Sequence, residues 1–581
     1  MTSPAVVAEF STVSQNIAQS FVQTVVIVDD RAFEPVEPMP KPTEPPQSPV
    51  RPRFTATQDQ QASKDQVTAM PQDAVVDSEG QKEVIDQATT PEETSEDAAH
   101  RLDAKKAIEQ FANKGIVCAV LRPSEIEMDQ FVSKLYGLAE VTDVLIFDWV
   151  WFEDVEGKKV SEVITNITKQ SSQQHRLRLI LIYTGEKDLK VVIDDLAKIL
   201  TQNGAQNTRI DDFTINSAGT RITVYSKGNI ELSDEVLRSR VSPPDQLPST
   251  VVAEFAKLTS GLLSNVALLS LAAVRSNTHR LLSRFGPDLD APFLSHRAML
   301  PEPEDANALL VQLIGGELTA ILDGHEVGGA ADSFSGLDML KAWIDSKERD
   351  GYEFAKRFTA GKQTDVLDQL NTLLRNGVSS DTLHAPFDSF KKDPQKRDLT
   401  QKLAIKDTNA EELEHRFAVL TTLKSNYRSS THPPLLVPGT LVKKIDEEGR
   451  PNYLICIQPI CDCVRLDETR TFPFLQLRTP TDKDAAFDLV LPDNETYVRL
   501  RVDYSPYRSK LIDFKPSKSV RAIVSEVNEG RIQFTAMDGT LFDWIGELKV
   551  DQTQRIVNNY AAQIARVGLD ESEWLRRWAK R

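Results

Sequence analysis

The chain has 581 residues, of which 40% are hydrophobic and 27% are charged, and its formal net charge is −18. A single hydrophobic core does not grow to this size, so several domains are expected. The hydrophobic and charged fractions are ordinary for a water-soluble protein. The negative charge argues against nucleic acid as a general partner, because phosphates would be repelled.

The cysteines and the N-terminal residues favour a reducing compartment. Four cysteines in this length do not make a disulfide framework. Residues 1–19 lack a basic stretch followed by an apolar core, so no secretory signal is expected. The most apolar run, 262–274, is too short to span a bilayer. We therefore expect a soluble, cytoplasmic protein that makes no membrane contact.

The first strand is followed by a change of composition. Residues 7–21 are predicted to form a short helix that leads into VVIV (25–28), and this strand runs into Asp29 and Asp30. From 32 to 99 the chain is rich in Pro, Gln, Ser, Asp and Glu and poor in apolar residues. Such a segment cannot offset the entropy of ordering it, which predicts a disordered insertion.

Order is predicted to resume in an alternating pattern. Further strands are expected at 116–123, 143–151, 177–186 and 221–228, and helices at 97–115, 129–140, 161–171 and 188–204. These strands are apolar on both faces, which is typical of a parallel sheet covered by helices on both sides. We therefore expect residues 1–230 to form a doubly wound α/β domain with a five-stranded parallel sheet.

The remaining chain is predicted to hold a linker and three further regions. SPPDQLPS marks a linker at 231–250. An all-α domain is expected at 251–430, starting with one long helix or with two helices broken near Gly261. Residues 431–550 read as short strands of a small antiparallel barrel or sandwich, and 551–581 as C-terminal helices.

Three cysteines cluster in the β-rich region, with the spacing C-x₄-C-x-C. Zinc sites usually need four ligands in C-x₂-C knuckles, and no histidine is nearby, so zinc is disfavoured. Alternation along a strand would place Cys461 and Cys463 on one buried face. The role of Cys456, Cys461 and Cys463 stays open.

Polar residues stand at the ends of the predicted parallel strands. Asp29 and Asp30 follow the first strand, Asp148 the third, Thr184 the fourth and Lys227 the fifth. The carboxyl ends of such strands form the ligand edge of a doubly wound sheet. Three carboxylates suit Mg²⁺. With the cation bound, the Asp148 carboxylate can attack phosphorus while the lysine and the hydroxyl bind phosphoryl oxygens.

The segments VVIVDD, VLIFDWVW, LILIYTGE and ITVYSK resemble the strands of response-regulator receiver domains. The resemblance covers about residues 20–230. It implies that Asp148 is phosphorylated by a histidine-kinase-like ATPase, and that Thr184 and Lys227 complete the site. The Mg²⁺ ligands it implies are Asp29, Asp30, Asp148 and the Val150 carbonyl.

The sequence also departs from the receiver pattern. Gly228 stands where a proline usually follows the lysine, and the aromatic switch position, three before the lysine, is Val224, with Tyr225 next. WVWF follows Asp148, and Gly157 stands near the family's turn glycine. These changes leave phosphoryl transfer in place as an expectation and put the usual switching route in doubt. With these departures, the region resembles divergent receiver-like domains of bacterial proteins encoded in conflict or phage-defence loci.

Two other functions compete with signalling. Acidic residues at the ends of parallel strands with Mg²⁺ also describe phosphohydrolases and nucleases, although the Asp-x-Asp spacing that these enzymes carry is missing here. A scaffold with an inactive receiver is the third reading. The favoured hypothesis is a non-enzymatic signalling protein of the two-component type, whose output region acts through protein partners that the sequence does not identify.

Overall fold

The computed structural model describes residues 10–566 with gaps. The longer gaps are 34–100, 229–234, 325–336, 359–362, 393–397, 428–431 and 482–485, and the shorter ones are 153, 174–175, 206, 218, 385–386, 406–407 and 495. The predicted disordered insertion lies outside the described residues, except for Ala32–Phe33, which form β2 and pair with β3 (Leu102–Asp103). The chain divides into two compact units, Met1–Ser346 and Lys347–Arg581. The predicted division into more domains stays a prediction.

The first unit is built around a seven-stranded sheet with the order β4-β1-β5-β6-β9-β8-β7. The first five strands in this order are parallel, as predicted. Two strands that were not predicted, β8 and β7, extend the β9 edge antiparallel. The strands are β1 (Thr24–Val28), β4 (Val117–Leu121), β5 (Val144–Phe147), β6 (Arg178–Thr184), β7 (Thr208–Asp211), β8 (Thr214–Ser217) and β9 (Thr220–Ser226).

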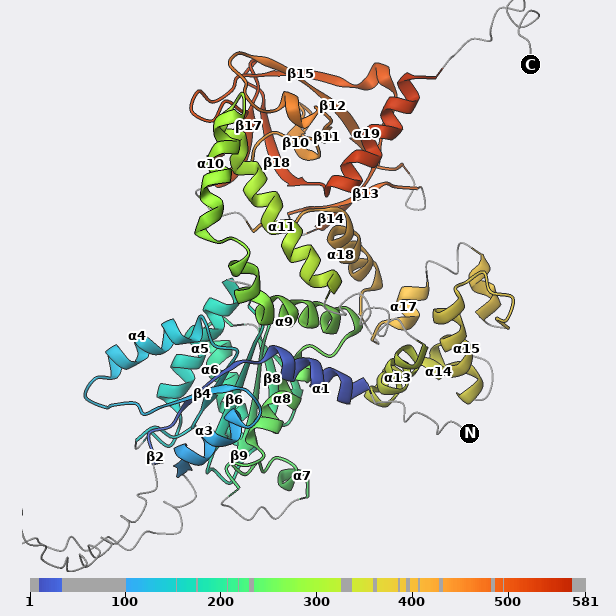
Figure 1. The fold of residues 1–581 in the computed structure, drawn as a ribbon. Helices are drawn as coiled ribbons and strands as arrows, with labels where there is room; N and C mark the ends of the chain where they lie inside the picture. Colours follow the sequence, from blue (N-terminus) through green and yellow to red (C-terminus); the bar gives the residue numbers. More distant parts are fainter. Residues whose placement is uncertain are drawn as a thin grey trace, which may run out of the picture. The chain divides into compact units, whose positions relative to one another are not determined.

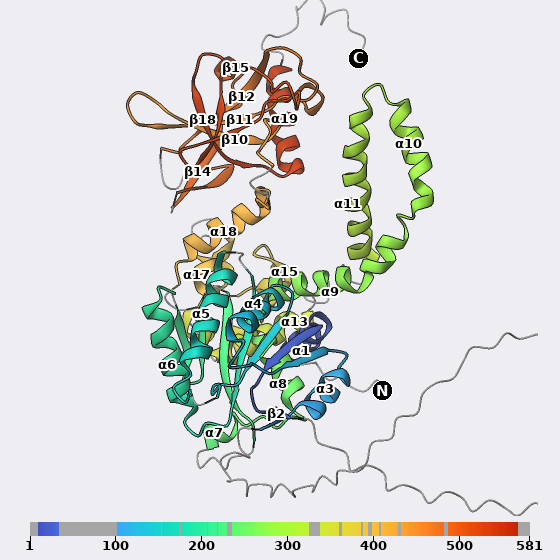
Figure 2. The same ribbon diagram turned by 90° about the vertical axis from the view of Figure 1, so that its left-hand side faces the viewer.

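Helices cover both faces of this sheet (Figures 1 and 2). One face carries α1 (Phe10–Phe21), α3 (Ala104–Ala112) and α8 (Leu247–Leu258), and the other carries α4 (Met128–Ala139), α5 (Lys158–Gln173) and α6 (Leu189–Gln202). Successive strand residues point to opposite faces, so Ile27 joins the first cluster and Val28 the second. Both faces are buried, which explains the continuous apolar runs of β1, β5 and β6.

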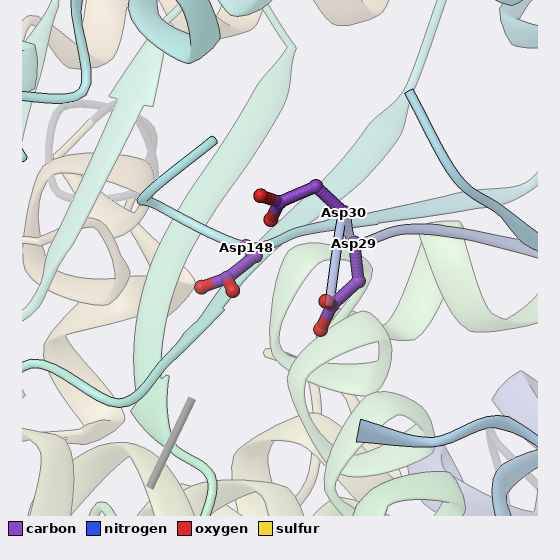
Figure 3. A group of neighbouring side chains, drawn as sticks. All are labelled: Asp29, Asp30 and Asp148. Atoms are coloured by element: carbon purple, nitrogen blue, oxygen red, sulfur yellow. The ribbon is translucent and has the colours of Figure 1, made fainter. Parts of the chain in front are cut away.

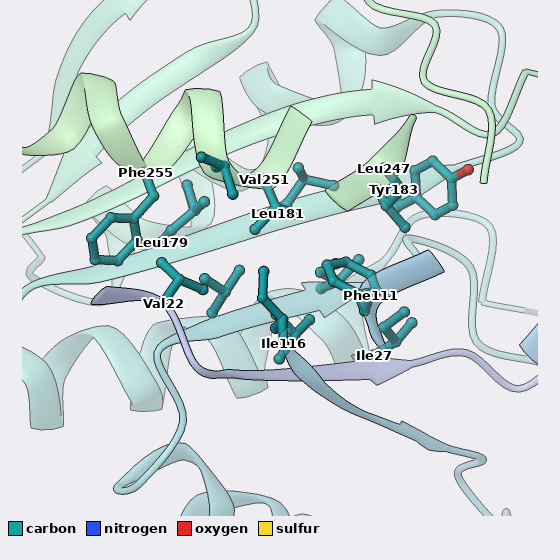
Figure 4. Packing of buried hydrophobic residues seen from close by; sticks show 14 of the residues in the cluster. Val22, Ile27, Phe111, Ile116, Leu179, Leu181, Tyr183, Leu247, Val251 and Phe255 are labelled. Atoms are coloured by element: carbon teal, nitrogen blue, oxygen red, sulfur yellow. The ribbon is translucent and has the colours of Figure 1, made fainter. Parts of the chain in front are cut away.

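Helix α8 packs on the sheet rather than starting a separate helical layer (Figure 4). Its Val251 and Phe255 lie over Leu179 and Leu181 of β6. A short turn at Gly261 separates α8 from α9 (Leu262–Ser283), which is the two-helix alternative of the sequence prediction. Seven of the twelve α8 residues are buried, so hydrophobic burial explains why this helix docks here.

A buried ion-pair network also fastens α8 to the sheet. The Glu254 carboxylate accepts hydrogen bonds from Arg221 Nε at 2.9 Å, the Tyr225 hydroxyl at 2.8 Å and Lys257 Nζ at 2.6 Å. Burial alone would raise the pKa of Glu254, but Arg221 and Lys257 outweigh it and hold that pKa below its usual value. Arg221 and Tyr225, the two β9 residues in this network, therefore hold α8 on the sheet through Glu254.

Replacing Glu254 with Gln is expected to cost about 3 kcal/mol of unfolding free energy near pH 7, because Arg221 then loses its buried partner. Since the folded pKa of Glu254 lies below the unfolded value, its contribution is complete above about pH 4.3 and is lost as the pH falls through the folded pKa. Urea unfolding of both proteins near pH 7 and pH 3 checks this. An equal difference at the two pH values would contradict it.

The rest of the first unit is helical. It contains α7 (Glu235–Arg238), α9, α10 (Asp290–Met299), α11 (Ala306–Gly324) and α13 (Leu337–Lys347), whose last residue lies in the second unit. Arg275 of α9 makes a bidentate ion pair with Asp143, which fixes α9 to the sheet before β5.

Within the described chain, one helical stretch, Pro303–Gly324, is long and apolar enough to cross a bilayer by length and composition. One such helix is weak evidence for a membrane span.

The second unit combines helices with an antiparallel sheet. Its helices are α14 (Phe354–Arg357), α15 (Gln363–Asn376), α17 (Leu399–Leu403), α18 (Ala410–Thr422) and α19 (Val550–Ile564). The strands are β10 (Thr440–Ile445), β11 (Pro451–Cys456), β12 (Arg470–Arg478), β13 (Leu489–Asp493), β14 (Thr496–Val502), β15 (Lys510–Phe514), β16 (Glu526–Asn528), β17 (Arg531–Thr535) and β18 (Leu541–Glu547). Strand β15 pairs with β12, and a bridge from Phe514 to Ala536 brings it to the residue after β17.

The positions of the cysteines in this unit differ from those predicted for a continuous strand. Cys461 lies in a 3₁₀ turn, Ile460–Asp462, and is exposed, whereas Cys456 and Cys463 are buried. The predicted shared face of Cys461 and Cys463 was wrong, because β11 ends at Cys456 and the following residues turn. Burial raises the pKa of the Cys463 thiol to about 12, and that of Cys456 is raised for the same reason, so both thiols stay protonated.

Candidate functional site

Three aspartates meet at the carboxyl ends of two neighbouring parallel strands (Figure 3). Asp29 and Asp30 follow β1, and Asp148 follows β5. One carboxylate oxygen from each lies within 4.8 Å of those of the other two. Asp29 and Asp148 are each 1% exposed, and Asp30 is half-buried. The predicted gathering of these three carboxylates is therefore seen in the structure.

Among the described residues, Lys227 is the only lysine whose ammonium group forms an ion pair with these carboxylates. It follows β9, is 1% exposed, and its Nζ lies 2.7 Å from Asp29 Oδ2 and 2.8 Å from Asp148 Oδ2. The second oxygen of Asp29 accepts a hydrogen bond from the Arg31 backbone N–H at 2.8 Å. Lys227 thus links the end of β9 to Asp29, 198 positions away in the chain, and to Asp148, 79 positions away.

The charges in this site do not balance. Three carboxylates lie near one ammonium, that of Lys227, which contacts two of them, Asp29 and Asp148. Burial raises the pKa of Asp148 to about 7, opposed by Lys227 and reinforced by Asp29. Burial would lower the pKa of Lys227, but Asp148 and Asp29 outweigh it and raise that pKa above its usual value. The lysine therefore keeps its proton, and the site has excess negative charge that a cation would neutralise.

Two carboxylate oxygens of this site have no hydrogen-bond donor among the described residues. Within the described part of the chain, Asp30 Oδ1 and Asp148 Oδ1 are buried and accept no hydrogen bond. Buried polar atoms are almost always satisfied, so two unsatisfied oxygens in a cluster of three carboxylates call for a ligand. Oxygen ligands of this kind, supplemented by water, fit Mg²⁺. Val150 lies buried two residues after Asp148, and its carbonyl as a fourth ligand stays a prediction.

Thr184 ends β6, the strand next to β5. It is fully buried, and its hydroxyl accepts a hydrogen bond from the Glu186 N–H at 3.2 Å. Strand β6 lies between β5 and β9, so the threonine stands between the strand ends that carry Asp148 and Lys227. The topology therefore places every predicted side chain of the site at one edge of the sheet.

The loop after Asp148 is held by a close aromatic contact. Trp149 is 3% exposed, and a Cβ added to Gly157 would lie 2.3 Å from its indole Cε2. Gly157 also has φ +64°, which L side chains rarely adopt. Its Asp154 neighbour caps α5 by accepting from the Lys159 N–H at 2.8 Å. Glycine is thus required where the loop folds back over Trp149.

The residues before Lys227 do not offer an aromatic switch at the usual position. Val224 packs in the cluster beneath α4, α5 and α6. Tyr225 points to the opposite face and donates to Glu254 of α8. Gly228, which stands where receivers usually carry a proline, has φ +84° and lies against Pro243. The alternation of β9 explains why Tyr225 cannot replace an aromatic residue at position 224.

Residues 21–231 match the family model described as response receiver domain. The match spans the five parallel strands and both groups of sheet-covering helices except α1 and α8. Residues 21–231 therefore form a receiver domain. A receiver domain is a response-regulator-type signalling module that usually binds Mg²⁺ at an acidic site. No curated protein and no solved structure gave a match.

One residue at this site was missed by sequence reasoning. The backbone N–H of Phe152, four residues after Asp148, donates to Asp30 Oδ2 at 2.7 Å. Phe152 has φ +60°, a conformation that the sequence did not signal, because phenylalanine is not a residue that favours it. The run WVWF was noted only as a departure from the expected pattern.

Proposed function

We propose that Asp148 accepts a phosphoryl group from a partner histidine-kinase-like ATPase in a Mg²⁺-dependent reaction. The observation that carries this proposal is the position of Asp148 between Asp30 and Lys227, with one carboxylate oxygen buried and unsatisfied. Such a group is a nucleophile whose charge a cation and an ammonium can offset.

The transfer balances as a substitution at phosphorus. An oxygen of the Asp148 carboxylate forms the new P–O bond, the P–N bond to the donor histidine breaks, and its electron pair stays on the imidazole nitrogen. Lys227 would bind a phosphoryl oxygen once it exchanges its contact with Asp148 for the added group, and the Thr184 hydroxyl would donate to another. Bound Mg²⁺ would lower the repulsion between the carboxylates and the phosphoryl oxygens.

The output is proposed to run through protein contacts of the regions after residue 231. Lys227 lies next to Ser226, whose backbone exchanges hydrogen bonds with Arg240 and Ser242, and these precede α8. Tyr183, adjacent to Thr184, donates to the Ser242 carbonyl at 2.7 Å. A shift of Lys227 or Thr184 on phosphorylation would therefore act on the start of α8. The bacterial setting and the link to phage defence are predictions from the resemblance alone, and the cytoplasmic setting is a prediction from the cysteine usage and the N-terminal residues.

Incubation of the full chain with acetyl phosphate and Mg²⁺ tests the proposal. We expect the intact mass to increase by one phosphoryl group, and the increase to disappear when EDTA replaces Mg²⁺. Hydrolysis of a phosphomonoester or of nucleic acid by the same protein, without a mass change, would favour a phosphohydrolase or nuclease instead. A chain that binds Mg²⁺ yet takes no phosphoryl group would be an inactive receiver.

A further inference from the structure

The loop between β5 and α5 contains a residue in an uncommon backbone conformation. Phe152 has φ +60°, in the left-handed region that residues other than Gly, Asn and Asp seldom occupy. Lys159 Nζ lies over its ring, 5.2 Å from the centroid. Strained residues of this kind persist where the surroundings hold them, and they gather at functional sites.

The conformation of Phe152 presents its backbone N–H to the acidic cluster. That N–H donates to Asp30 Oδ2 at 2.7 Å, across 122 positions of sequence. Within the described residues, the other oxygen of Asp30, Oδ1, has no hydrogen-bond partner and is buried. A carboxylate that is tied at one oxygen cannot rotate freely, so the second oxygen keeps a fixed direction.

The neighbours of Phe152 explain how the loop holds this geometry. Trp151 and Asp154 form an isolated antiparallel bridge on either side of it. Trp151 is fully buried and packs edge-to-face against Phe131 of α4. Trp149 packs over Gly157, as described above. Both indoles, which precede Phe152 in the chain, are therefore anchored in the core, and the Phe152 amide that follows Trp151 has little freedom to move.

We propose that the backbone N–H of Phe152 positions Asp30, so that its Oδ1 faces the cation that the three carboxylates bind. This inference rests on the proposed function and adds a positioning residue to it. Groups that orient metal ligands typically contribute about 10–100-fold in metal affinity. The amide acts in the unphosphorylated protein, before any phosphoryl donor is bound.

Substitutions at Phe152 separate the N–H from the aromatic ring. Phe152→Asn keeps the N–H and tolerates the left-handed conformation, whereas Phe152→Pro removes the N–H and fixes φ near −65°. Mg²⁺ alone is titrated into the full chain, and the fluorescence of the tryptophans beside Asp148 is recorded. We expect Phe152→Asn to bind Mg²⁺ within about two-fold of wild type and Phe152→Pro to bind at least about ten-fold more weakly.

Two control variants complete the titration. Lys159→Met removes the cation over the Phe152 ring and is expected to leave Mg²⁺ affinity unchanged. Asp30→Asn is expected to weaken binding at least as much as Phe152→Pro. If Asp30→Asn binds as wild type does, the proposed function fails. If Asp30→Asn is weak while Phe152→Pro is normal, only the positioning role fails.

The remaining outcomes also decide the matter. Equal weakening by Phe152→Asn and Phe152→Pro would overturn the inference, because it would assign the effect to the ring. Circular dichroism reports whether each variant is folded at the assay temperature. If Phe152→Pro is unfolded, Phe152→Val replaces it, since a β-branched side chain disfavours positive φ while keeping the N–H. It is then expected to bind Mg²⁺ several-fold more weakly than Phe152→Asn, and equal affinity would contradict the role.

Discussion

Replacing Lys227 with methionine is expected to lower the unfolding free energy by about 3–5 kcal/mol in the absence of divalent cations. Lys227 is 1% exposed, and its ammonium contacts both Asp29 and Asp148. Methionine has a similar volume but no charge, so it leaves two buried carboxylates without their common cation. The cost comes from these uncompensated charges rather than from lost packing.

The loss in Lys227→Met is expected to depend on pH and on Mg²⁺. Lys227 opposes the rise that burial causes in the pKa of Asp148, so without the lysine that pKa rises further and ionisation of Asp148 opposes folding more strongly. The variant should therefore lose stability as the pH rises from about 5 to 8, and millimolar Mg²⁺ should restore part of it by binding the folded state.

Urea unfolding with and without Mg²⁺ measures both effects. Lys198→Met is the matched control, since Lys198 pairs with Asp195 on the surface, with 68% and 41% of the two side chains exposed. An exposed pair of this kind contributes less than about 1 kcal/mol. Equal losses in the two variants would show that the three buried charges are not coupled as described.

Replacing Asp148 with asparagine is expected to abolish phosphoryl acceptance and to stabilise the fold at the same time. Asparagine keeps the shape of the side chain but has no carboxylate to attack phosphorus. It also removes one of three like charges in a dry site. We expect a gain of about 1–2 kcal/mol near pH 8 without Mg²⁺, because functional sites often trade stability for activity.

The sign of the pH effect follows from the raised pKa of Asp148. Its folded pKa, about 7, lies above the unfolded value near 3.9, so ionisation of Asp148 opposes folding increasingly between these values. The stability advantage of Asp148→Asn should be absent near pH 4 and should grow up to about pH 7. Asp154→Asn, in the same loop, is the control: asparagine can still accept the hydrogen bond from the Lys159 N–H, so phosphoryl acceptance should be unchanged and the unfolding free energy should change by less than about 0.5 kcal/mol. A less stable Asp148→Asn at high pH would contradict this electrostatic account.

The parallel core of the first unit could be predicted because its signals are local. The apolar runs of β1, β5 and β6 are buried on both faces, and each ends at a polar residue where the strand ends. The hairpin of β7 and β8 could not be predicted in the same way. Its sequence, TRID and TINS, is short and polar, and it forms a sheet edge only because β9 supplies hydrogen bonds.

The acidic site, too, has features that local sequence signals predict and features that they do not. The order of Asp29, Asp148 and Lys227 on parallel strands was enough to predict that they meet. The direct contact of Lys227 with both aspartates depends on side-chain geometry that no local pattern encodes. The hydrogen bond from Phe152 to Asp30 depends on a residue in the left-handed region, which no local sequence pattern signals at a phenylalanine.

The identity of the modified residue is the most direct test of the account. After incubation with acetyl phosphate and Mg²⁺, borohydride reduction converts an aspartyl phosphate to homoserine, which peptide mass spectrometry locates in the sequence. We predict homoserine at position 148 in the wild-type chain, and none there when EDTA replaces Mg²⁺ or in Asp148→Asn. Homoserine at another aspartate, or none anywhere in a chain that still binds Mg²⁺, would contradict Asp148 as the phosphoryl acceptor.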